Sequence, residues 1–212
     1  MDVHAVYDVF LRRFRRRRMR AFAAAFRLGP TTRVLDVGGT PYNWQWLETP
    51  CRLTLLNLEP PAELPPGARA VVGSGARLGF RDGAFDVAFS NSVIEHLGSF
   101  ERQAAFASEL RRVARGVWVQ TPARGFPIEP HLLGVGIHYL PRRWQRRLVR
   151  RATLWGWLSR PTPERIDAFL AETRLLDRRE LQQLFPDCEI RRERVLGLTK
   201  AYVAVRLPAA VR

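Results

Sequence analysis

The chain contains almost no lysine. Of its 35 basic residues 34 are arginines, against Lys200 alone, and only 20 acidic residues oppose them, so the formal net charge is +15 at pH 7. We attribute the scarcity of lysine to codon usage and draw no function from it. The positive excess itself predicts attraction to anions such as nucleic acid, acidic lipid headgroups or phosphorylated substrates.

Cysteines are also few, and long apolar runs are missing. Cys51 and Cys188 lie far apart, without the CxxC or Cys/His spacing of a metal site. We therefore expect no metal ion and no disulfide framework, and both thiols to pack as ordinary side chains. No apolar run approaches the roughly 18–20 residues of a membrane span, and no signal-peptide pattern begins the chain. These absences predict a cytoplasmic protein.

The residues that are present predict an α/β domain. A length of 212 residues suits one domain with a full core. Five apolar stretches have the length and composition of strands: 34–37, 53–58, 70–72, 85–89 and 117–119. Helical patterns at 3–27 and 100–114 alternate with them, and any helix at 44–47 must be brief. Such alternation is typical of βαβ units and a parallel sheet.

The last third of the chain has a different pattern. Residues 122–141 are rich in proline and glycine, which predicts a long loop of the kind that often carries function. Residues 142–160 are basic and aromatic. A last helix at 177–185 and an antiparallel hairpin, formed by 188–195 and 199–207, complete the expected elements.

The first predicted strand ends in the most informative segment, RVLDVGGTPYN at residues 33–43. Its apolar run stops at Gly38 and Gly39, which indicates a turn where the backbone passes close to a ligand. Glu59 ends the second strand about 20 residues later, where an acid typically binds ribose hydroxyls. A carboxylate suits a diol because it accepts two hydrogen bonds at once. No G-x-G-x-x-G follows the first strand, which argues against an NAD-type domain.

Three later segments extend this pattern: RDGAFDVAF at 81–89, SNSVIEHL at 90–97, and ELRRVA with WVQTP within 109–122. Together with the first turn they resemble the class I S-adenosylmethionine-dependent methyltransferases, in particular bacterial small-molecule enzymes with a type 11 methyltransferase domain. The resemblance covers about residues 30–122. It implies a Rossmann-like, seven-stranded, mostly parallel sheet with helices on both faces and a C-terminal antiparallel hairpin.

The resemblance also implies a division of the chain and a cofactor. We expect a single domain over 1–212, with a basic helix (1–29), a donor-binding core (30–122), a substrate-side loop and helices (123–176), and a final helix and hairpin (177–212). S-adenosyl-L-methionine is the expected methyl donor.

The implied cofactor-binding residues follow the strand ends. By resemblance, the first turn borders the methionine part of the donor, Glu59 holds the ribose, and the backbone after the fourth strand lies near the sulfur. Ser74 stands where the family commonly has an acid beside the adenine, and Pro41 removes a backbone donor from the turn. The full set is Asp36, Gly38, Gly39, Thr40, Glu59, Ser74, Asn91 and Ser92.

Three histidines are the catalytic candidates. Methyl transfer needs alignment of nucleophile, methyl and sulfur, and sometimes a base. His131 follows the fifth strand, over the expected substrate pocket; if it is not catalytic, we expect it to be an exposed loop residue. His96 lies near the expected donor; if it is not catalytic, we expect it to cap the next helix. His138 is the third candidate.

Two basic segments leave the partners open. The helix around residues 10–22 places arginines beside spaced phenylalanines, which suits an anionic membrane or RNA. We favour a lid helix that packs its phenylalanines on the domain. Residues 142–151 repeat the basic, aromatic pattern.

We therefore predict a methyltransferase for a small-molecule acceptor, lipid-linked or anionic, in the cytoplasm or peripheral to the inner membrane face. One alternative is an RNA methyltransferase, although residues 90–93 lack the Asn/Asp-Pro-Pro-Tyr/Phe motif for a flipped adenine. The other is a non-catalytic binding module with an altered donor turn.

Overall fold

The computed structural model describes residues 3–47 and 51–208, with side chains from residue 12 onward. One sheet contains the strands β1 (Arg33–Val37), β2 (Arg52–Asn57), β3 (Arg69–Val72), β4 (Phe85–Asn91), β5 (Ala114–Pro122), β8 (Glu189–Val195) and β9 (Leu198–Arg206). Their order is β3-β2-β1-β4-β5-β9-β8. The first five strands are parallel, and β9 pairs antiparallel with both β5 and β8. The predicted Rossmann-like sheet with a terminal hairpin is confirmed.

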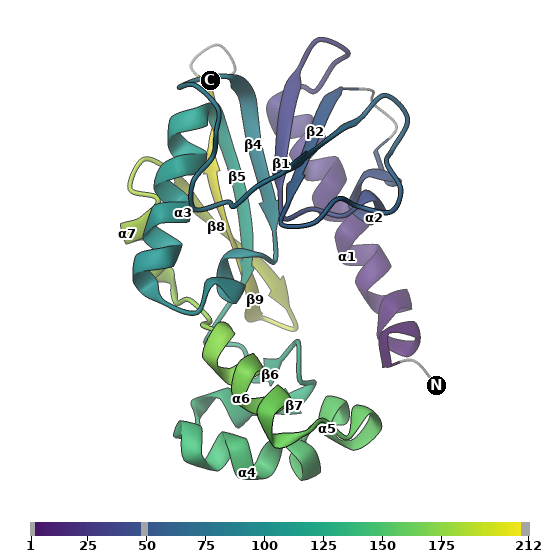
Figure 1. Cartoon of the computed structure of the whole chain (residues 1–212), viewed down its shortest axis with the longest axis vertical. Coiled ribbons are helices and arrows are strands. Elements are labelled where there is room, and N and C mark those ends of the chain that lie inside the picture. Colours follow the sequence, from purple (N-terminus) through teal and green to yellow (C-terminus); the bar gives the residue numbers. More distant parts are fainter. Residues whose placement is uncertain (1–2, 48–50, 209–212) are drawn as a thin grey trace.

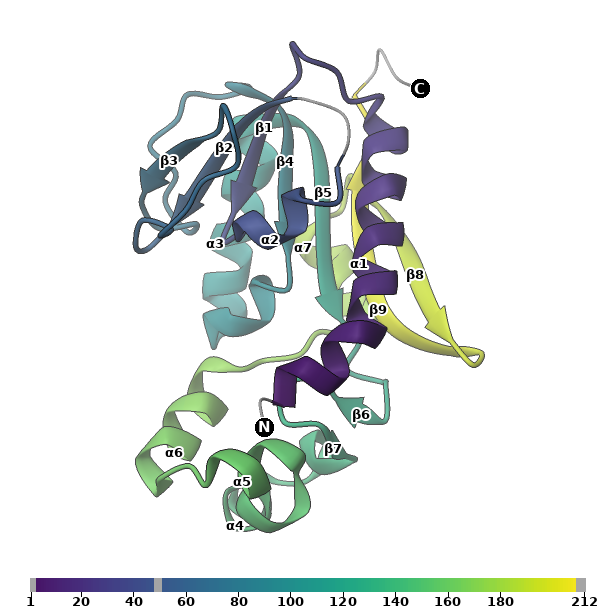
Figure 2. The ribbon, with the colours of Figure 1, turned by 90° about the vertical axis from the view of Figure 1, so that its right-hand side faces the viewer.

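Helices cover both faces of this sheet. The described helices are α1 (Val3–Phe26), α2 (Pro41–Trp44), α3 (Phe100–Val113), α4 (Arg142–Ala152), α5 (Leu154–Ser159), α6 (Pro163–Glu172) and α7 (Arg178–Leu184), with short 3₁₀ helices η1 (Ile94–Leu97) and η2 (Ile137–Tyr139). Helices α3 and α7 lie on one face, and α1 and α2 on the other (Figures 1 and 2). The strand order reverses between β1 and β4, where open α/β sheets bind ligands.

Each face of the sheet has its own hydrophobic core. On the α3 side, Phe106 and Leu110 pack with Leu35 of β1. On the α1 side, Phe22 packs against Phe89, with their ring centroids 4.7 Å apart. The parallel strands read as continuous apolar runs because both of their faces are buried. Each such fully buried side chain contributes about 2 kcal/mol to stability.

Helix α1 packs on the sheet, as the lid interpretation expects. Met19, Phe22 and Phe26 are buried, and Arg16 is exposed. Arg18 is buried as well: its Nε and Nη2 donate to the Glu193 carboxylate at 2.7 and 2.6 Å. The apolar residues predicted before position 12 have side chains outside the described part.

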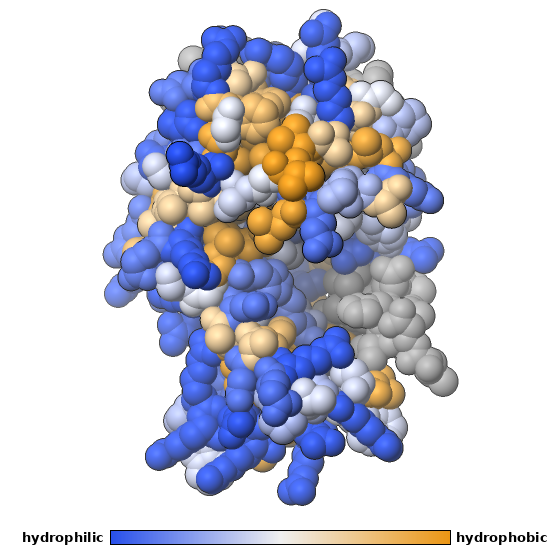
Figure 3. Space-filling view, in the orientation of Figure 1, coloured by the Kyte–Doolittle hydropathy of each residue, from blue (hydrophilic) through white to orange (hydrophobic). Residues whose placement is uncertain are grey.

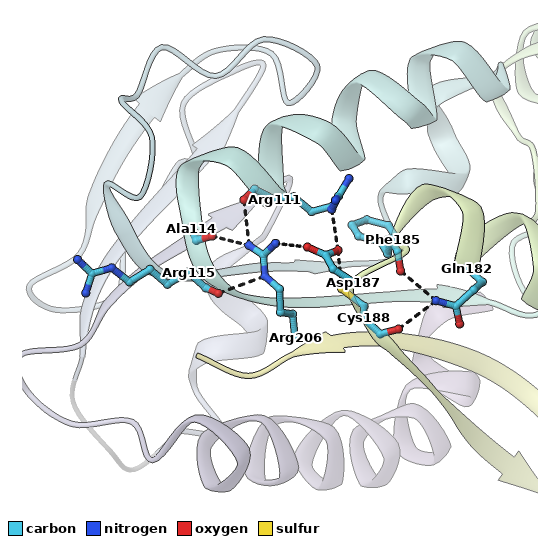
Figure 4. Close-up of polar contacts among 8 residues, drawn as sticks. All are labelled: Arg111, Ala114, Arg115, Gln182, Phe185, Asp187, Cys188 and Arg206. Atoms are coloured by element: carbon cyan, nitrogen blue, oxygen red, sulfur yellow. Dashed lines mark hydrogen bonds and ion pairs between the residues drawn. The ribbon is translucent and has the colours of Figure 1, made fainter. Parts of the chain in front are cut away.

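The terminal hairpin is anchored by Arg206 at the end of β9 (Figure 4). Its guanidinium donates to the carbonyls of Arg111, Ala114 and Arg115, where α3 ends and β5 begins. It also pairs with Asp187, which accepts from Arg111 Nε at 2.7 Å. A cation thus satisfies carbonyls that the end of α3 leaves without helical partners.

Residues 128–172 form a small lobe beyond the carboxyl end of β5 (Figure 1). The prediction of a plain loop over 122–141 is wrong, because β6 (Ile128–Glu129) pairs with β7 (Gly134–Val135) and η2 follows. The lobe has a core of its own, made of Leu132, Ile137, Val149, Ile166 and Leu170.

The sequence also predicts the short helix and the packing of the two cysteines, and the structure describes both. The brief helix expected at 44–47 is α2, and it begins earlier because proline suits the first helical position. Cys51 and Cys188 are free thiols that pack against the two sheet cores, as expected. Within the residues that the structure describes, no helix combines the length and apolar composition of a membrane span.

Candidate functional site

A cavity of ≈ 570 Å³ opens at the carboxyl ends of β1, β2 and β3. That volume is typical of a site for a small organic ligand. Of the predicted cofactor-binding residues, five line it: Gly38, Gly39, Thr40, Glu59 and Ser74. The cavity therefore lies where the sequence places the ligand, at the reversal of the strand order.

The turn after β1 requires both of its glycines. Gly38 has φ +76°, and a Cβ there would come within 2.6 Å of a Val93 methyl group. A Cβ on Gly39 would lie 1.7 Å from Asp36 Oδ2. Asn57 Nδ2 donates to the Gly39 carbonyl at 3.0 Å, so β2 holds the turn in place. Bare backbone consequently forms this wall of the cavity.

Asp36 lies beneath the turn rather than in the cavity wall. Its side chain is fully buried, and Oδ2 accepts a hydrogen bond from Trp44 Nε1 at 2.7 Å. Burial raises the pKa of this carboxyl to about 7, and the bond from Trp44 only partly offsets that effect. Asp36 thus supports the turn from below and does not line the cavity; its place beside the methionine part of the donor stays a prediction.

Asn91 and Ser92 are likewise engaged elsewhere. Asn91 Oδ1 accepts from Arg18 Nη1 at 2.5 Å, and Ser92 Oγ donates to Gln120 Oε1 at 2.9 Å. Neither residue lines the cavity. Val93, the N-cap of η1, and Leu97, its last residue, line it instead. The sequence signal for them is their apolar character within VIEHL.

The far end of the cavity carries Glu59 and Ser74. The Glu59 side chain is exposed at the cavity wall, just past β2. Ser74 Oγ accepts from the Ala76 backbone N–H at 3.3 Å, so this hydroxyl closes a turn. The arrangement offers one carboxylate and several backbone groups to a polar ligand in an otherwise apolar hollow.

A second group of polar side chains lies at η1 and the start of the lobe. His131 Nδ1 is 2.6 Å from Glu129 Oε1, and its Nε2 is 3.8 Å from Glu95 Oε1. The rings of His96 and His131 meet edge to face, with centroids 4.6 Å apart. The structure therefore brings together two of the three candidate histidines.

Burial and the neighbouring charges together shift the pKa values of Glu95, His96 and His131. Burial alone would lower the pKa of His131, but the hydrogen bond and charge of Glu129, aided by Glu95, outweigh it and raise the pKa. Glu95 is fully buried, which raises its pKa to about 7. His96 is partly exposed to solvent, yet its partial burial, with the charge of His131, lowers its pKa to about 4.

The alternative role for His96, capping the next helix, is wrong. Ser99 caps α3 instead, its side chain accepting from Arg102 N. Gln103 of α3 fixes the η1 segment, since its Nε2 donates to the carbonyls of Ile94 and Arg174. His96 and Glu95 are therefore presented from a segment that α3 holds rigidly.

His138 lies outside this group. Its Nε2 is 3.0 Å from the Arg124 carbonyl, and it lines a second, smaller cavity of ≈ 220 Å³. Three arginines share that cavity: Arg124, Arg142 and Arg174. A basic hollow of this kind suits an anionic group.

Comparisons with known proteins agree with this geometry. Residues 35–116 match a family model described as a methyltransferase domain. An S-adenosylmethionine-dependent methyltransferase from Methanosarcina mazei shares the fold with a TM-score of 0.54 and 14% identity, over 85% of this chain and 95% of that chain. No curated protein matches the chain significantly.

Two further solved structures are similar. One is the 1,6-didemethyltoxoflavin-N1-methyltransferase of Burkholderia thailandensis, solved with bound 1,6-didemethyltoxoflavin and S-adenosylhomocysteine. It has a TM-score of 0.57 and 16% identity, over 95% of this chain and 81% of that chain. The other is the magnesium protoporphyrin IX methyltransferase of Synechocystis, with bound S-adenosylhomocysteine (TM-score 0.52, 11% identity, 90% and 83%).

Residues 35–116 thus match a methyltransferase domain, and the solved structures share the fold of the whole sheet. Both findings agree with the predicted class, a class I S-adenosylmethionine-dependent methyltransferase.

Proposed function

We propose that this methyltransferase binds its donor in the ≈ 570 Å³ cavity and methylates a small anionic molecule that enters from the lobe. The observation that carries the proposal is the cavity itself, at the ends of β1, β2 and β3. Its wall of bare backbone at Gly38 and Gly39 and its carboxylate at Glu59 are the groups that a nucleoside with an amino-acid tail requires.

The residues present fit such a donor. Glu59 is placed to accept hydrogen bonds from both ribose hydroxyls. Val93 and Leu97 offer an apolar surface to the centre of the molecule, and Ser74 lies at the end where the adenine is expected. When bound, the donor supplies an electrophilic methyl group on its sulfonium. The chain then has to align the acceptor with it and exclude water.

The second cavity supports an anionic acceptor. Arg124, Arg142 and Arg174 line it together with His138, and Glu129 connects it to the histidine group. Hydrophilic side chains project from the lobe in Figure 3, and α4 of this lobe is rich in arginine. We infer that the acceptor bears a carboxylate or a phosphate group, which bidentate arginine contacts recognise.

The lobe surface also supports a lipid-linked form of this acceptor. Trp144 and Trp157 are exposed, by 45% and 69%, beside the arginines of α4. Aromatic rings next to cations are suited to the headgroup region of an anionic membrane. Peripheral contact at the inner membrane face would present such an acceptor to the lobe.

His131 is our candidate for the residue that receives the acceptor's proton. The carboxylate of Glu129 holds Nδ1–H and orients the ring, which leaves Nε2 as the proton acceptor. His96 and His138 are weaker candidates, because His96 already titrates near pH 4 and His138 is held at the Arg124 carbonyl.

Calorimetric titration with S-adenosylmethionine and S-adenosylhomocysteine tests the donor site. We expect micromolar binding by the natural protein and a loss of about tenfold or more in Glu59→Ala, since one charged hydrogen-bonding group contributes about 1.5–3 kcal/mol. Glu63→Ala is the matched control: Glu63 is exposed in the same connection but does not line the cavity.

Absence of binding by the folded natural protein would overturn the proposal in favour of a non-catalytic module. If the donor binds, a screen of carboxylate- and phosphate-bearing acceptors follows, with bulk RNA as the competing substrate. Methyl incorporation into RNA alone, weakened steeply by salt, would contradict the small-molecule assignment and favour the RNA alternative.

A further inference from the structure

Glu95, His96 and His131 form a cluster with the composition of a metal site. Each offers one ligand atom, and these atoms all lie within 4.8 Å of one another. Glu95 and His96 come from η1, and His131 comes from the lobe, between β6 and β7. The cluster thus joins the donor-binding sheet to the lobe.

The hydrogen bond at His131 Nδ1 determines what Nε2 can do. When Nδ1–H donates to Glu129, Nε2 of the neutral ring carries a lone pair. That lone pair faces Glu95 Oε1 across 3.8 Å, a separation too long for a hydrogen bond. Oε1 is buried and has no hydrogen-bond partner among the described residues. When both groups are deprotonated, two electron-pair donors face each other in a region of low dielectric, and a cation between them, a proton or a metal ion, would satisfy both.

The distances suit such an ion. Two donor atoms that each lie about 2.0–2.2 Å from a tetrahedrally coordinated ion are about 3.3–3.6 Å apart. The 3.8 Å between Glu95 Oε1 and His131 Nε2 is slightly wider, so a small movement of either side chain brings both atoms to one ion. All the ligand atoms lie within 4.8 Å of one another, and His96 is the exposed member that can move closer.

The surroundings hold the ligands in the way that metal sites usually do. Glu129 orients His131 through Nδ1, and its other oxygen accepts from Leu132 N at 2.5 Å. Thr121 Oγ1 donates to Glu95 Oε2 at 3.0 Å, which turns Oε1 toward the histidines. A carboxylate behind a metal-binding imidazole fixes its tautomer and raises its basicity.

We propose that Glu95, His96 and His131 bind a divalent transition-metal ion of the zinc, iron, cobalt or manganese type. One carboxylate and two imidazoles suit these ions better than magnesium or calcium, which prefer all-oxygen sites. Three protein ligands leave coordination positions open for an acceptor oxygen. This proposal replaces the expectation of no metal, which rested on cysteine spacing.

Only the role of the ion in catalysis rests on the proposed function. A bound ion would take His131 as a ligand and would lower the pKa of a coordinated acceptor group, whose proton would then pass to solvent. Without the ion, His131 itself would take up that proton. Metal binding itself stands apart from the methyltransferase assignment and is measured without donor or acceptor.

Titration of the chelator-treated full-length protein with Co²⁺, followed by its visible absorption and by competition with Zn²⁺, tests the site. We expect one Co²⁺ per chain, with affinity reduced at least about 100-fold in His131→Ala and in His96→Ala. Glu129→Gln should weaken binding about 10- to 100-fold, as loss of an orienting partner does. His138→Ala, which changes a histidine outside the cluster, should bind as the natural protein does.

Circular dichroism establishes that each variant is folded, and His96→Ala is the least disruptive because that ring is partly exposed. Failure of the natural protein to bind Co²⁺ or Zn²⁺ at millimolar concentration would overturn the proposal. Undiminished binding by both His96→Ala and His131→Ala would overturn it too, because the ion would then lie elsewhere. If the natural protein binds the metal ion but not S-adenosylmethionine, the proposed function is contradicted and the metal site is not.

Discussion

The buried carboxyl of Asp36 predicts an unusual dependence of stability on pH. Its folded-state pKa of about 7 lies above the ordinary value, so the folded protein keeps a proton that the unfolded chain releases between about pH 4 and pH 7. The free energy of unfolding therefore falls as the pH rises through that window. We expect Asp36→Asn to remove up to about 4 kcal/mol of this fall, as measured by urea unfolding at several pH values.

Asp82→Asn is the control for that experiment, because the Asp82 side chain is 83% exposed. A residual fall with pH is expected from Glu95, whose pKa is raised by the same cause. An Asp36→Asn variant whose stability depends on pH as steeply as that of the natural protein would contradict the buried, protonated state of Asp36.

Adding one methyl group at Gly39 tests how tightly the turn after β1 is packed. Gly39→Ala would force the turn away from Asp36, since the new Cβ would lie 1.7 Å from Oδ2. We expect a loss of about 1–3 kcal/mol in unfolding free energy and weaker donor binding, measured by urea unfolding and calorimetry. Gly125→Ala should change stability by less than about 0.5 kcal/mol, because its Cβ meets nothing within 4 Å. Equal effects at both positions would refute this account of the turn.

At the scale of elements, Arg206 predicts how the hairpin is attached. Its guanidinium satisfies three carbonyls at the junction of α3 and β5 and pairs with Asp187. We expect Arg206→Ala to lower the unfolding free energy by about 2–3 kcal/mol, because part-buried carbonyls and Asp187 lose a charged donor. Arg191→Ala should cost less than about 0.5 kcal/mol, since Arg191 pairs only with Glu189 on the surface of the same strand. Thermal and urea unfolding measure both, and similar losses would show that Arg206 is no anchor.

The elements themselves differ in how far the sequence predicts them. Strands such as β1 and β4 are apolar runs that end at glycine or polar residues, so local pattern defines them. The lobe escaped prediction because its strands have two residues each and its glycines and prolines are typical of loops. Its stability comes from a core contributed by residues far apart in the chain.

The site shows the same division. The glycine turn and Glu59 could be predicted because a strand end and a spacing locate them. The contact of Arg18 with Asn91 could not, because it joins residues 73 positions apart and depends on how α1 lies on the sheet. The cluster of Glu95, His96 and His131 likewise appears only when the lobe folds back over η1.

At the scale of the whole molecule, the charge and the two cavities have a common consequence. Arginines are concentrated on α1 and α4; α4 lies in the lobe, and the N-terminal part of α1 approaches the lobe at α5 (Figure 2). The field of the molecule therefore favours approach of anions to the same side on which the acceptor is proposed to enter. In the proposed function, the sheet provides the donor site, and the lobe provides the charge that selects the acceptor.

The structure of the protein crystallised with S-adenosylhomocysteine tests the central claim most directly. The account predicts the ligand in the ≈ 570 Å³ cavity, with its ribose hydroxyls at Glu59, its adenine toward Ser74 and its sulfur near Val93. A ligand bound elsewhere, or an intact protein with an empty cavity at millimolar ligand concentration, would contradict it.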